Sequence, residues 1–202
     1  MKKRLLSLVL SLALCLCLTL PAYAGQSVCP SWLEQGADFD NASSFTDPLT
    51  PIKKGRLWGY ADRLGRIVIA PQYDYALAFS DGLAAVSKNG KCGYINTAGT
   101  VVIPLQYEGS NSFSDGLATV NQNGKYGFID KTGKVIVPPQ YEYVFDFSNG
   151  LALVSENQKC GYINQEGKVV VPLQYDGGYN FTSEGLALVY KDDKWGYVDQ
   201  TG

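Results

Sequence analysis

The side chains best able to carry acid–base chemistry are four carboxylates near the start of the chain. They are Glu34, Asp38, Asp40 and Asp47. Two carboxylates can hydrolyse a glycosidic bond when their surroundings raise the pKa of one of them. No neighbouring pattern supplies such surroundings, and the absence of histidine excludes a Ser-His-Asp triad, a Cys-His dyad and His-ligated zinc. We therefore expect no catalytic residue and no enzyme activity.

An Asp or Asn recurs along the chain with a glycine three residues after it. The pairs are Asp62 and Gly65, Asn96 and Gly99, Asp130 and Gly133, Asn164 and Gly167, and Asp199 and Gly202. Calcium takes about six to eight oxygen ligands from converging groups, whereas this pattern offers one side chain at each site. Asx at the first position and a left-handed glycine at the fourth are typical of a type I turn. We predict turns here, with no metal and no cofactor.

Three aromatic positions recur at a constant spacing. The Tyr column contains Tyr73, Tyr107, Tyr141 and Tyr175, the Phe column contains Phe79, Phe113, Phe147 and Phe181, and the Trp-Gly column contains Trp58, Tyr126 and Trp195. An exposed row of tyrosines could stack on the sugar rings of a cell-wall glycan. A buried row would form a core in which each hydroxyl is hydrogen-bonded. We favour the core and assign all three columns a structural role, because positions repeated in every copy mostly serve stacking between copies.

These columns belong to one motif with a period of 34 residues. The pairs Trp58-Gly59, Cys92-Gly93, Tyr126-Gly127, Cys160-Gly161 and Trp195-Gly196 stand 34, 34, 34 and 35 residues apart. The single extra residue lies between Phe181 and Gly185, where we expect a loop. After an N-terminal segment of residues 25–38, residues 39–202 form the repeat domain. Its copies are 39–72, which is degraded, then 73–106, 107–140, 141–174 and the incomplete 175–202.

Each copy has the pattern of an antiparallel β-meander. In copy 107–140, residues 117–120, 125–130 and 134–137 are three apolar or alternating runs, and Asn123-Gly124 is a strong signal for a two-residue hairpin. The link between the Tyr and Phe columns could add a fourth, irregular strand. A 34-residue unit is shorter than the roughly 40 residues that fold unaided. Copies must therefore bury their apolar faces against one another.

The expected fold is all-β, a tandem array of about five three-stranded meanders in an open, solenoid-like stack. The alternative is a small β-propeller, whose blades usually need four strands and about 40–45 residues. The two differ in whether the first and last copies touch. The glycine of each of the five pairs that begin at Trp58 is expected to let a neighbouring backbone or ring come close.

The motif Lys194-Trp195-Gly196-Tyr197-Val198-Asp199 and the similar run at residues 57–62 resemble the WG-repeat family. The middle copies depart from it, with Cys92, Tyr126 and Cys160 at the tryptophan position. The resemblance covers residues 39–202. It implies a β-repeat array without established catalytic residues, and it suggests partner binding at the cell surface.

Residues 1–24 have the form of a signal peptide. Lys2, Lys3 and Arg4 precede an apolar run of 16 residues, and Ala24 ends a small-residue cleavage site. Because a bilayer crossing takes about 20 residues, we expect cleavage after Ala24 and a secreted or extracytoplasmic protein with no membrane span in the mature chain. Cleavage leaves 14 cations against 19 anions, a net charge of −5. This charge argues against nucleic-acid binding.

The mature chain keeps Cys29, Cys92 and Cys160. The last two occupy the same repeat position, where other copies have an aromatic residue. We expect buried free thiols that act as small apolar groups, with a disulfide as the alternative.

The predicted function is that of a non-catalytic scaffold for protein–protein interaction at the cell surface. The alternative is a cell-wall or polysaccharide-binding module that uses aromatic residues. Because repeated positions build the scaffold, a binding surface is expected at the variable positions between the Tyr and Phe columns. The predicted binding residues are Tyr75, Leu77, Asn111, Tyr143, Phe145 and Tyr179.

Overall fold

The computed structural model describes residues 40–42 and 48–202, and within these ranges every regular element is a β-strand. The described residues form five small antiparallel sheets in tandem, each with its strands in chain order, which confirms the predicted all-β array. We number these sheets 1 to 5 along the chain. The signal-peptide region, Cys29, Glu34, Asp38 and Asp47 lie outside the described residues.

Every sheet begins with a two-residue strand that the sequence pattern indicated only as an irregular addition. These strands are β1 (Asn41–Ala42), β5 (Tyr75–Ala76), β9 (Gly109–Ser110), β13 (Tyr143–Val144) and β17 (Gly177–Gly178). A hairpin of two six-residue strands follows: β2 (Leu49–Lys54) and β3 (Leu57–Asp62), β6 (Leu83–Lys88) and β7 (Lys91–Asn96), β10 (Leu117–Gln122) and β11 (Lys125–Asp130), β14 (Leu151–Glu156) and β15 (Lys159–Asn164), and β18 (Leu186–Lys191) and β19 (Lys194–Asp199). A seven-residue strand completes sheets 1 to 4: β4 (Ile67–Tyr73), β8 (Val101–Tyr107), β12 (Val135–Tyr141) and β16 (Val169–Tyr175).

In sheets 2 to 5 the hairpin turns where two consecutive residues take positive φ, whereas in the hairpin turn of sheet 1 only Gly55 does. Asn123 and Gly124 have φ of 54° and 72°, as the Asn-Gly signal predicts for a type I′ turn. Sheet 4 makes the same turn with Asn157 and Gln158, at 51° and 61°. Glycine adopts this left-handed region easily, whereas glutamine is strained there. The hairpin of sheet 4 therefore keeps its register despite a local backbone strain.

The Asx residues build the second turn of each sheet. The Asp130 carboxylate accepts hydrogen bonds from the backbone N–H of Thr132 and of Lys134, at 2.9 and 3.0 Å. Gly133, with φ of 85°, donates its N–H to the Asp130 carbonyl at 2.9 Å. The turn therefore accounts for this pattern, and no group of three or more metal-ligating side chains occurs among the described residues.

The glycine of each Trp-Gly pair lies under the backbone of the seven-residue strand. The pairing of β11 with β12 is irregular between Tyr126 and Phe128, so that β12 bulges over Gly127. A β carbon on Gly127 would stand 2.4 Å from the Val137 carbonyl oxygen. The same contact, at 2.4–2.5 Å, occurs at Gly59, Gly93 and Gly161. The expectation that this glycine admits a neighbouring backbone is confirmed.

The hydrophobic core lies between successive sheets. Between sheets 3 and 4, Phe128 and Tyr141 of sheet 3 pack with Val154 and Ile163 of sheet 4, and Phe147 from the link joins them. Three further clusters built from equivalent repeat positions fill the other intervals between sheets. Sheets 2, 3 and 4 thus contribute both faces to shared cores, and sheets 1 and 5 contribute one face each.

Hydrogen bonds from buried tyrosines add to these contacts. The hydroxyls of Tyr60, Tyr94 and Tyr162 each donate to a backbone carbonyl 17 residues later, at 2.7 Å. Burial raises the pKa of all three, that of Tyr162 to about 12, so the hydroxyls remain donors at neutral pH. Phe128 occupies this position in sheet 3 and supplies the ring alone.

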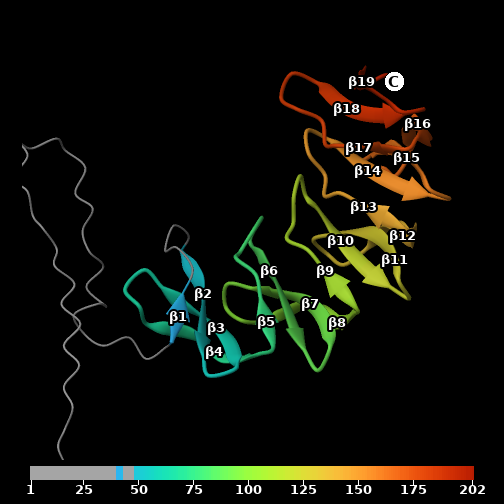
Figure 1. Ribbon diagram of the computed structural model, residues 1–202. Helices are drawn as coiled ribbons and strands as arrows, with labels where there is room; N and C mark the ends of the chain where they lie inside the picture. Colours follow the sequence, from blue (N-terminus) through green and yellow to red (C-terminus); the bar gives the residue numbers. More distant parts are fainter. Residues whose placement is uncertain (1–39, 43–47) are drawn as a thin grey trace, which may run out of the picture.

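The five sheets stack face to face along an open, curved array (Figure 1). Sheet 1 and sheet 5 lie at opposite ends of it, so the array does not close into a propeller ring. The extra residue of the last copy falls before β18, where Gly185 donates its N–H to the Thr182 carbonyl in a turn. Leu186 still pairs with Asp199, as Leu151 pairs with Asn164 in sheet 4, so the strands keep their register.

Candidate functional site

The structure places the Tyr column inside the stack. Its four side chains are buried, and each pairs across its sheet with the Trp-Gly column, as Tyr107 does with Cys92 and Tyr141 with Tyr126. A row of buried rings offers no exposed surface on which sugars could stack.

The other two columns also contact the cores, with differences between copies. Phe113, Phe147 and Phe181 are buried and Phe79 is half-buried, and their ring centroids lie 4.7–4.9 Å from an aromatic ring of the preceding sheet. Trp58 and Tyr126 are half-buried, whereas Trp195 in sheet 5 is exposed. Cys92 and Cys160 are free thiols, as predicted, although they are half-buried rather than buried.

The variable positions divide into exposed and inward-facing residues. Tyr75, Tyr143 and Tyr179 are 54%, 47% and 55% exposed. Leu77 and Phe145, in contrast, are half-buried and pack against the cores that follow sheets 2 and 4. Of the six predicted binding residues, these two therefore serve the interior.

The three exposed tyrosines lie in or directly after the short strands β5, β13 and β17, which are edge strands of their sheets. We call the surface formed by Tyr75, Tyr143 and Tyr179 the short-strand edge. Tyr75 and Tyr143 hold the same register, since Tyr75 pairs with Ser87 and Tyr143 with Ser155 of the adjacent hairpin strand. Tyr75 meets Trp58 edge-on with ring centroids 6.2 Å apart, and Tyr179 lies 6.1 Å from Trp195. The edge thus carries aromatic side chains in fixed contact with the sheets.

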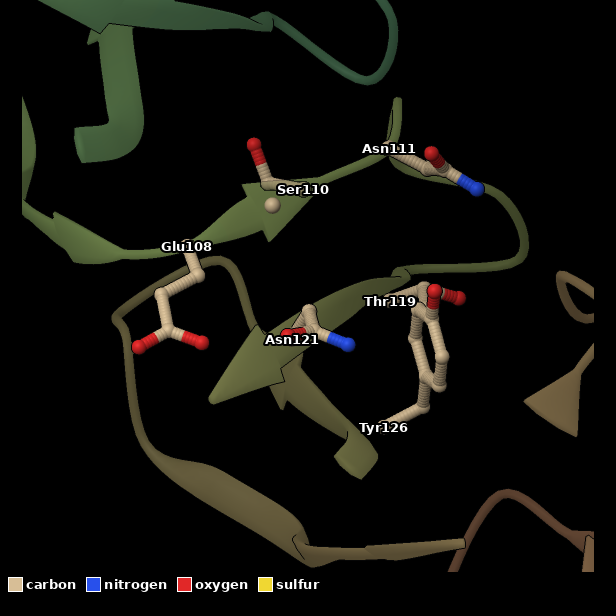
Figure 2. A pocket seen from close by; sticks show the side chains of 7 residues that line it. Glu108, Ser110, Asn111, Thr119, Asn121 and Tyr126 are labelled. Carbon is tan, nitrogen blue, oxygen red and sulfur yellow. The ribbon is translucent and has the colours of Figure 1, made fainter. Parts of the chain in front are cut away.

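Asn111, the remaining variable position, lines a pocket on the face of sheet 3 that is turned toward sheet 4. We call it the sheet 3 pocket. Its volume is about 390 Å³, within the range of small-ligand sites. Its lining residues are Glu108, Gly109, Ser110, Asn111, Thr119, Asn121 and Tyr126. Figure 2 shows these side chains rising from β9, β10 and β11, with the Ser110 hydroxyl pointing away from Tyr126.

The pocket exists because the side chains of sheet 3 are small or polar where its neighbours have large ones. Gly109 stands where sheets 2 and 4 have Tyr75 and Tyr143, and all three residues pair with the same position of the adjacent strand. Asn111 likewise replaces Leu77 and Phe145. The missing ring of Gly109 leaves the space open beside Asn121, its partner in β10.

Asp146, from the link that precedes β14, fixes two of the lining side chains. Its carboxylate accepts a hydrogen bond from the Thr119 hydroxyl at 2.6 Å and from the Asn111 amide nitrogen at 3.2 Å to each oxygen. The Asn111 carbonyl also accepts the Tyr94 hydroxyl, and its N–H donates to the Thr119 carbonyl at 3.1 Å. Asn111 is therefore held from three directions before any ligand arrives.

Glu108 differs from the acids at its position in the other copies. Asp40, Asp74 and Asp176 accept a backbone N–H from the tip of their own hairpin at 2.6–2.9 Å, and Glu142 does so at 3.4 Å. Glu108 lines the pocket instead, with Lys91 at 4.0 Å as its ion-pair partner. Both side chains of that pair are about half exposed, so water screens the interaction.

Sequence reasoning identified Asn111 as a binding position and Tyr126 as a structural one. It missed Glu108, Thr119, Asn121 and Asp146. A signal was present in the run Gly109-Ser110-Asn111, which replaces the bulkier Tyr75-Ala76-Leu77 of the previous copy. Such a replacement on one face of a stacked sheet indicates a local hollow.

The family described as WG containing repeat matches at residues 58–92, 93–126, 126–160 and 161–195. The chain belongs to this WG-repeat family. Its structure shows what the two letters of the motif do: the aromatic residue lies at the margin of the core between sheets, and the glycine lies under the bulge of the next strand.

Solved structures of propeller-like and β-repeat proteins resemble the WG-repeat array in fold. Kluyveromyces lactis Hsv2 matches with a TM-score of 0.53 and 10% identity over 82% of this chain and 62% of that one. A eukaryotic initiation factor matches with a TM-score of 0.52 and 15% identity over 80% of this chain and 52% of that one. The chain thus spans less than two thirds of either protein. No curated protein matches it by sequence.

Residues 40–42 and 48–202 consist of strands and the turns and links between them. That part of the chain contains no helix long and apolar enough to cross a bilayer.

Proposed function

We propose that this WG-repeat protein is an exported, non-catalytic scaffold that binds a protein partner at the cell surface through its short-strand edge. The observation that carries the proposal is the exposure of Tyr75, Tyr143 and Tyr179 at positions that vary between copies, while the Tyr column is buried. Tyrosine and tryptophan are enriched among the residues that dominate protein–protein binding energy.

Rigid support favours this role. Tyr75 and Tyr143 lie on edge strands of sheets 2 and 4, whose two faces are packed in shared cores, and Tyr179 follows an edge strand of sheet 5, which packs on sheet 4 through one face. Side chains on such elements lose little conformational freedom when a partner binds. The aromatic contacts of Tyr75 with Trp58 and of Tyr179 with Trp195 hold the rings further.

The glycan-binding alternative loses its main basis, since it drew on the Tyr column as a stacking platform. It keeps only the tyrosines of the short-strand edge. Export rests on the signal-peptide pattern of residues 1–24, with its three cations followed by an apolar run.

The test exposes the immobilised mature chain to membrane proteins solubilised from the host, beside cell-wall sacculi. We expect one discrete partner from the protein extract and no retention on sacculi. Replacing Tyr75, Tyr143 and Tyr179 together by alanine should abolish that capture. Tyr197→Ala is the matched control, because Tyr197 is 72% exposed but lies on the face of sheet 5. Retention on sacculi, or capture that survives the triple change, would contradict the proposal.

A further inference from the structure

Asp146 engages the hydrogen-bond donors of two residues that line the sheet 3 pocket, Asn111 and Thr119. A carboxylate only accepts hydrogen bonds, so the Asn111 amide must turn its nitrogen toward Asp146 and its oxygen away. The Thr119 hydroxyl likewise spends its only proton on Asp146 at 2.6 Å. Both residues are left with oxygen lone pairs for a ligand.

The charge around the pocket is negative. Glu108 lines it, and Asp146 lies directly behind Asn111 and Thr119. None of the seven described lining residues is a lysine or an arginine. Lys91, the cation nearest to Glu108, stands at the 4.0 Å limit of an ion pair and is half exposed. An anionic ligand would therefore meet repulsion, and a cation would find acceptors.

The shape adds an aromatic wall. The half-buried Tyr126 ring and the Asn121 amide occupy paired positions on β11 and β10, beside the space that Gly109 leaves open. An aromatic face attracts a flat, weakly hydrated cation, and carboxylate and amide oxygens match the forked N–H groups of a guanidinium.

We propose that the sheet 3 pocket binds the guanidinium group of an arginine side chain presented by the protein partner. The proposal rests on the proposed function and adds the chemistry of the residue that the partner inserts. Glu108 pairs with the cation, the oxygens of Asn111 and Thr119 accept its N–H groups, and Tyr126 lies against its plane.

Sheets 2, 4 and 5 differ from sheet 3 at the place of this pocket. In sheets 2 and 4 the rings of Tyr75 and Tyr143 stand at the position of Gly109. Sheet 5 again has a glycine, Gly177, but there the rings of Tyr190 and Trp195 pack 5.0 Å apart on the adjoining strands. Among the described sheets 2 to 5, sheet 3 thus has the position that selects a charged residue.

The experiment uses a blocked pentapeptide, Gly-Gly-Arg-Gly-Gly, and its twin with citrulline, the neutral isostere of arginine. NMR titration of the full mature chain follows the side-chain amides of Asn111 and Asn121. We expect saturable chemical-shift changes with the arginine peptide. The citrulline peptide should bind with an affinity at least about tenfold lower. Equal affinity for the arginine and citrulline peptides would overturn the proposal.

Variants separate charge from shape. Glu108→Gln should weaken binding of the arginine peptide about tenfold. Glu142→Gln should leave this binding unchanged, because Glu142 holds the same position in the next copy and has nearly the same exposure. Gly109→Tyr should abolish binding by placing in sheet 3 the ring that sheets 2 and 4 already have. Equal effects of the two Gln variants would count against the pocket. Partner capture that depends on the short-strand edge but not on Glu108 would overturn this inference alone and leave the proposed function standing.

Discussion

Gly127 and Val137 are in contact through their backbones: a β carbon on Gly127 would stand 2.4 Å from the Val137 carbonyl oxygen. The contact arises because β12 bulges where it passes Gly127, and the next two residues of β12, Pro138 and Pro139, cannot donate a ladder hydrogen bond. The glycine of the motif is therefore required by a neighbouring strand rather than by its own φ, which is not positive.

Replacing Gly127 by alanine should destabilise the protein by about 3 kcal/mol, because β12 must move away from the new methyl group. The midpoint of urea unfolding reports the loss. Gly196→Ala is the matched control, since no atom lies within 4 Å of the β carbon that it adds. It should change stability by less than about 0.5 kcal/mol. Equal losses in the two variants would show that the motif glycine serves its own strand instead.

The contribution of the buried tyrosine hydroxyl to stability should be measurable both by removing it and by adding it. Tyr94→Phe removes the donor to the Asn111 carbonyl and should cost about 1–2 kcal/mol. Phe128→Tyr adds a hydroxyl that can donate to the backbone carbonyl of Phe145, 17 residues later, as the tyrosines of other copies do. This change should stabilise the fold by about 1 kcal/mol. Thermal unfolding of both variants checks this, and a loss of stability in Phe128→Tyr would mean that the interval between sheets 3 and 4 is too narrow for the hydroxyl.

The hairpin of sheet 4 should gain stability from a single glycine. Gln158 has a φ of 61°, a region that costs a non-glycine residue about 1–2 kcal/mol. Gln158→Gly should therefore raise the unfolding midpoint, and Gly124→Gln, which places glutamine at the same turn position of sheet 3, should lower it by a similar amount. Opposite shifts of similar size are the expected result. No change in either variant would show that the turns tolerate glutamine without strain.

The sequence alone predicted the period, the turns and the need for stacking, because each depends on residues close together in the chain. Asn123-Gly124 and the Asp130 to Gly133 turn carry their geometry in four residues or fewer. The Tyr column indicated burial because a lone meander cannot cover its own face. The two-residue strands were beyond reach, since a strand such as β9 is too short to show an alternating pattern.

The sheet 3 pocket could not be predicted for a different reason. Its key contacts join residues 27 and 35 positions apart, from Asp146 to Thr119 and to Asn111. A period of 34 residues places equivalent residues in successive sheets, but it does not say which link reaches which face. The same link residue in the next copy is Asn180, whose side-chain oxygen is buried without a partner. Sheet 4 has Leu153 and Phe145 where sheet 3 has Thr119 and Asn111, which explains the difference.

Acid sensitivity should depend on the Asx turns. The hydrogen bond from the Thr132 hydroxyl, together with the backbone N–H groups of Thr132 and Lys134, lowers the pKa of Asp130 below its ordinary value. A carboxyl whose pKa is lower in the folded state stabilises the fold above its unfolded pKa of about 3.9. That contribution is lost as the pH falls through the lowered folded value.

Asp130→Asn should therefore lose less stability between pH 6 and pH 2.5 than the unmodified protein, while keeping the turn. Asn96 shows that the amide suffices, because its oxygen accepts the N–H groups of Ala98 and Thr100 at 3.0 Å. The difference should stay below about 1 kcal/mol, since Asp130 is largely solvated. The reverse change, Asn164→Asp, should increase the acid loss at the same turn of sheet 4. Unfolding midpoints of the two variants at both pH values test this, and parallel behaviour of the two would exclude the carboxyl as the source.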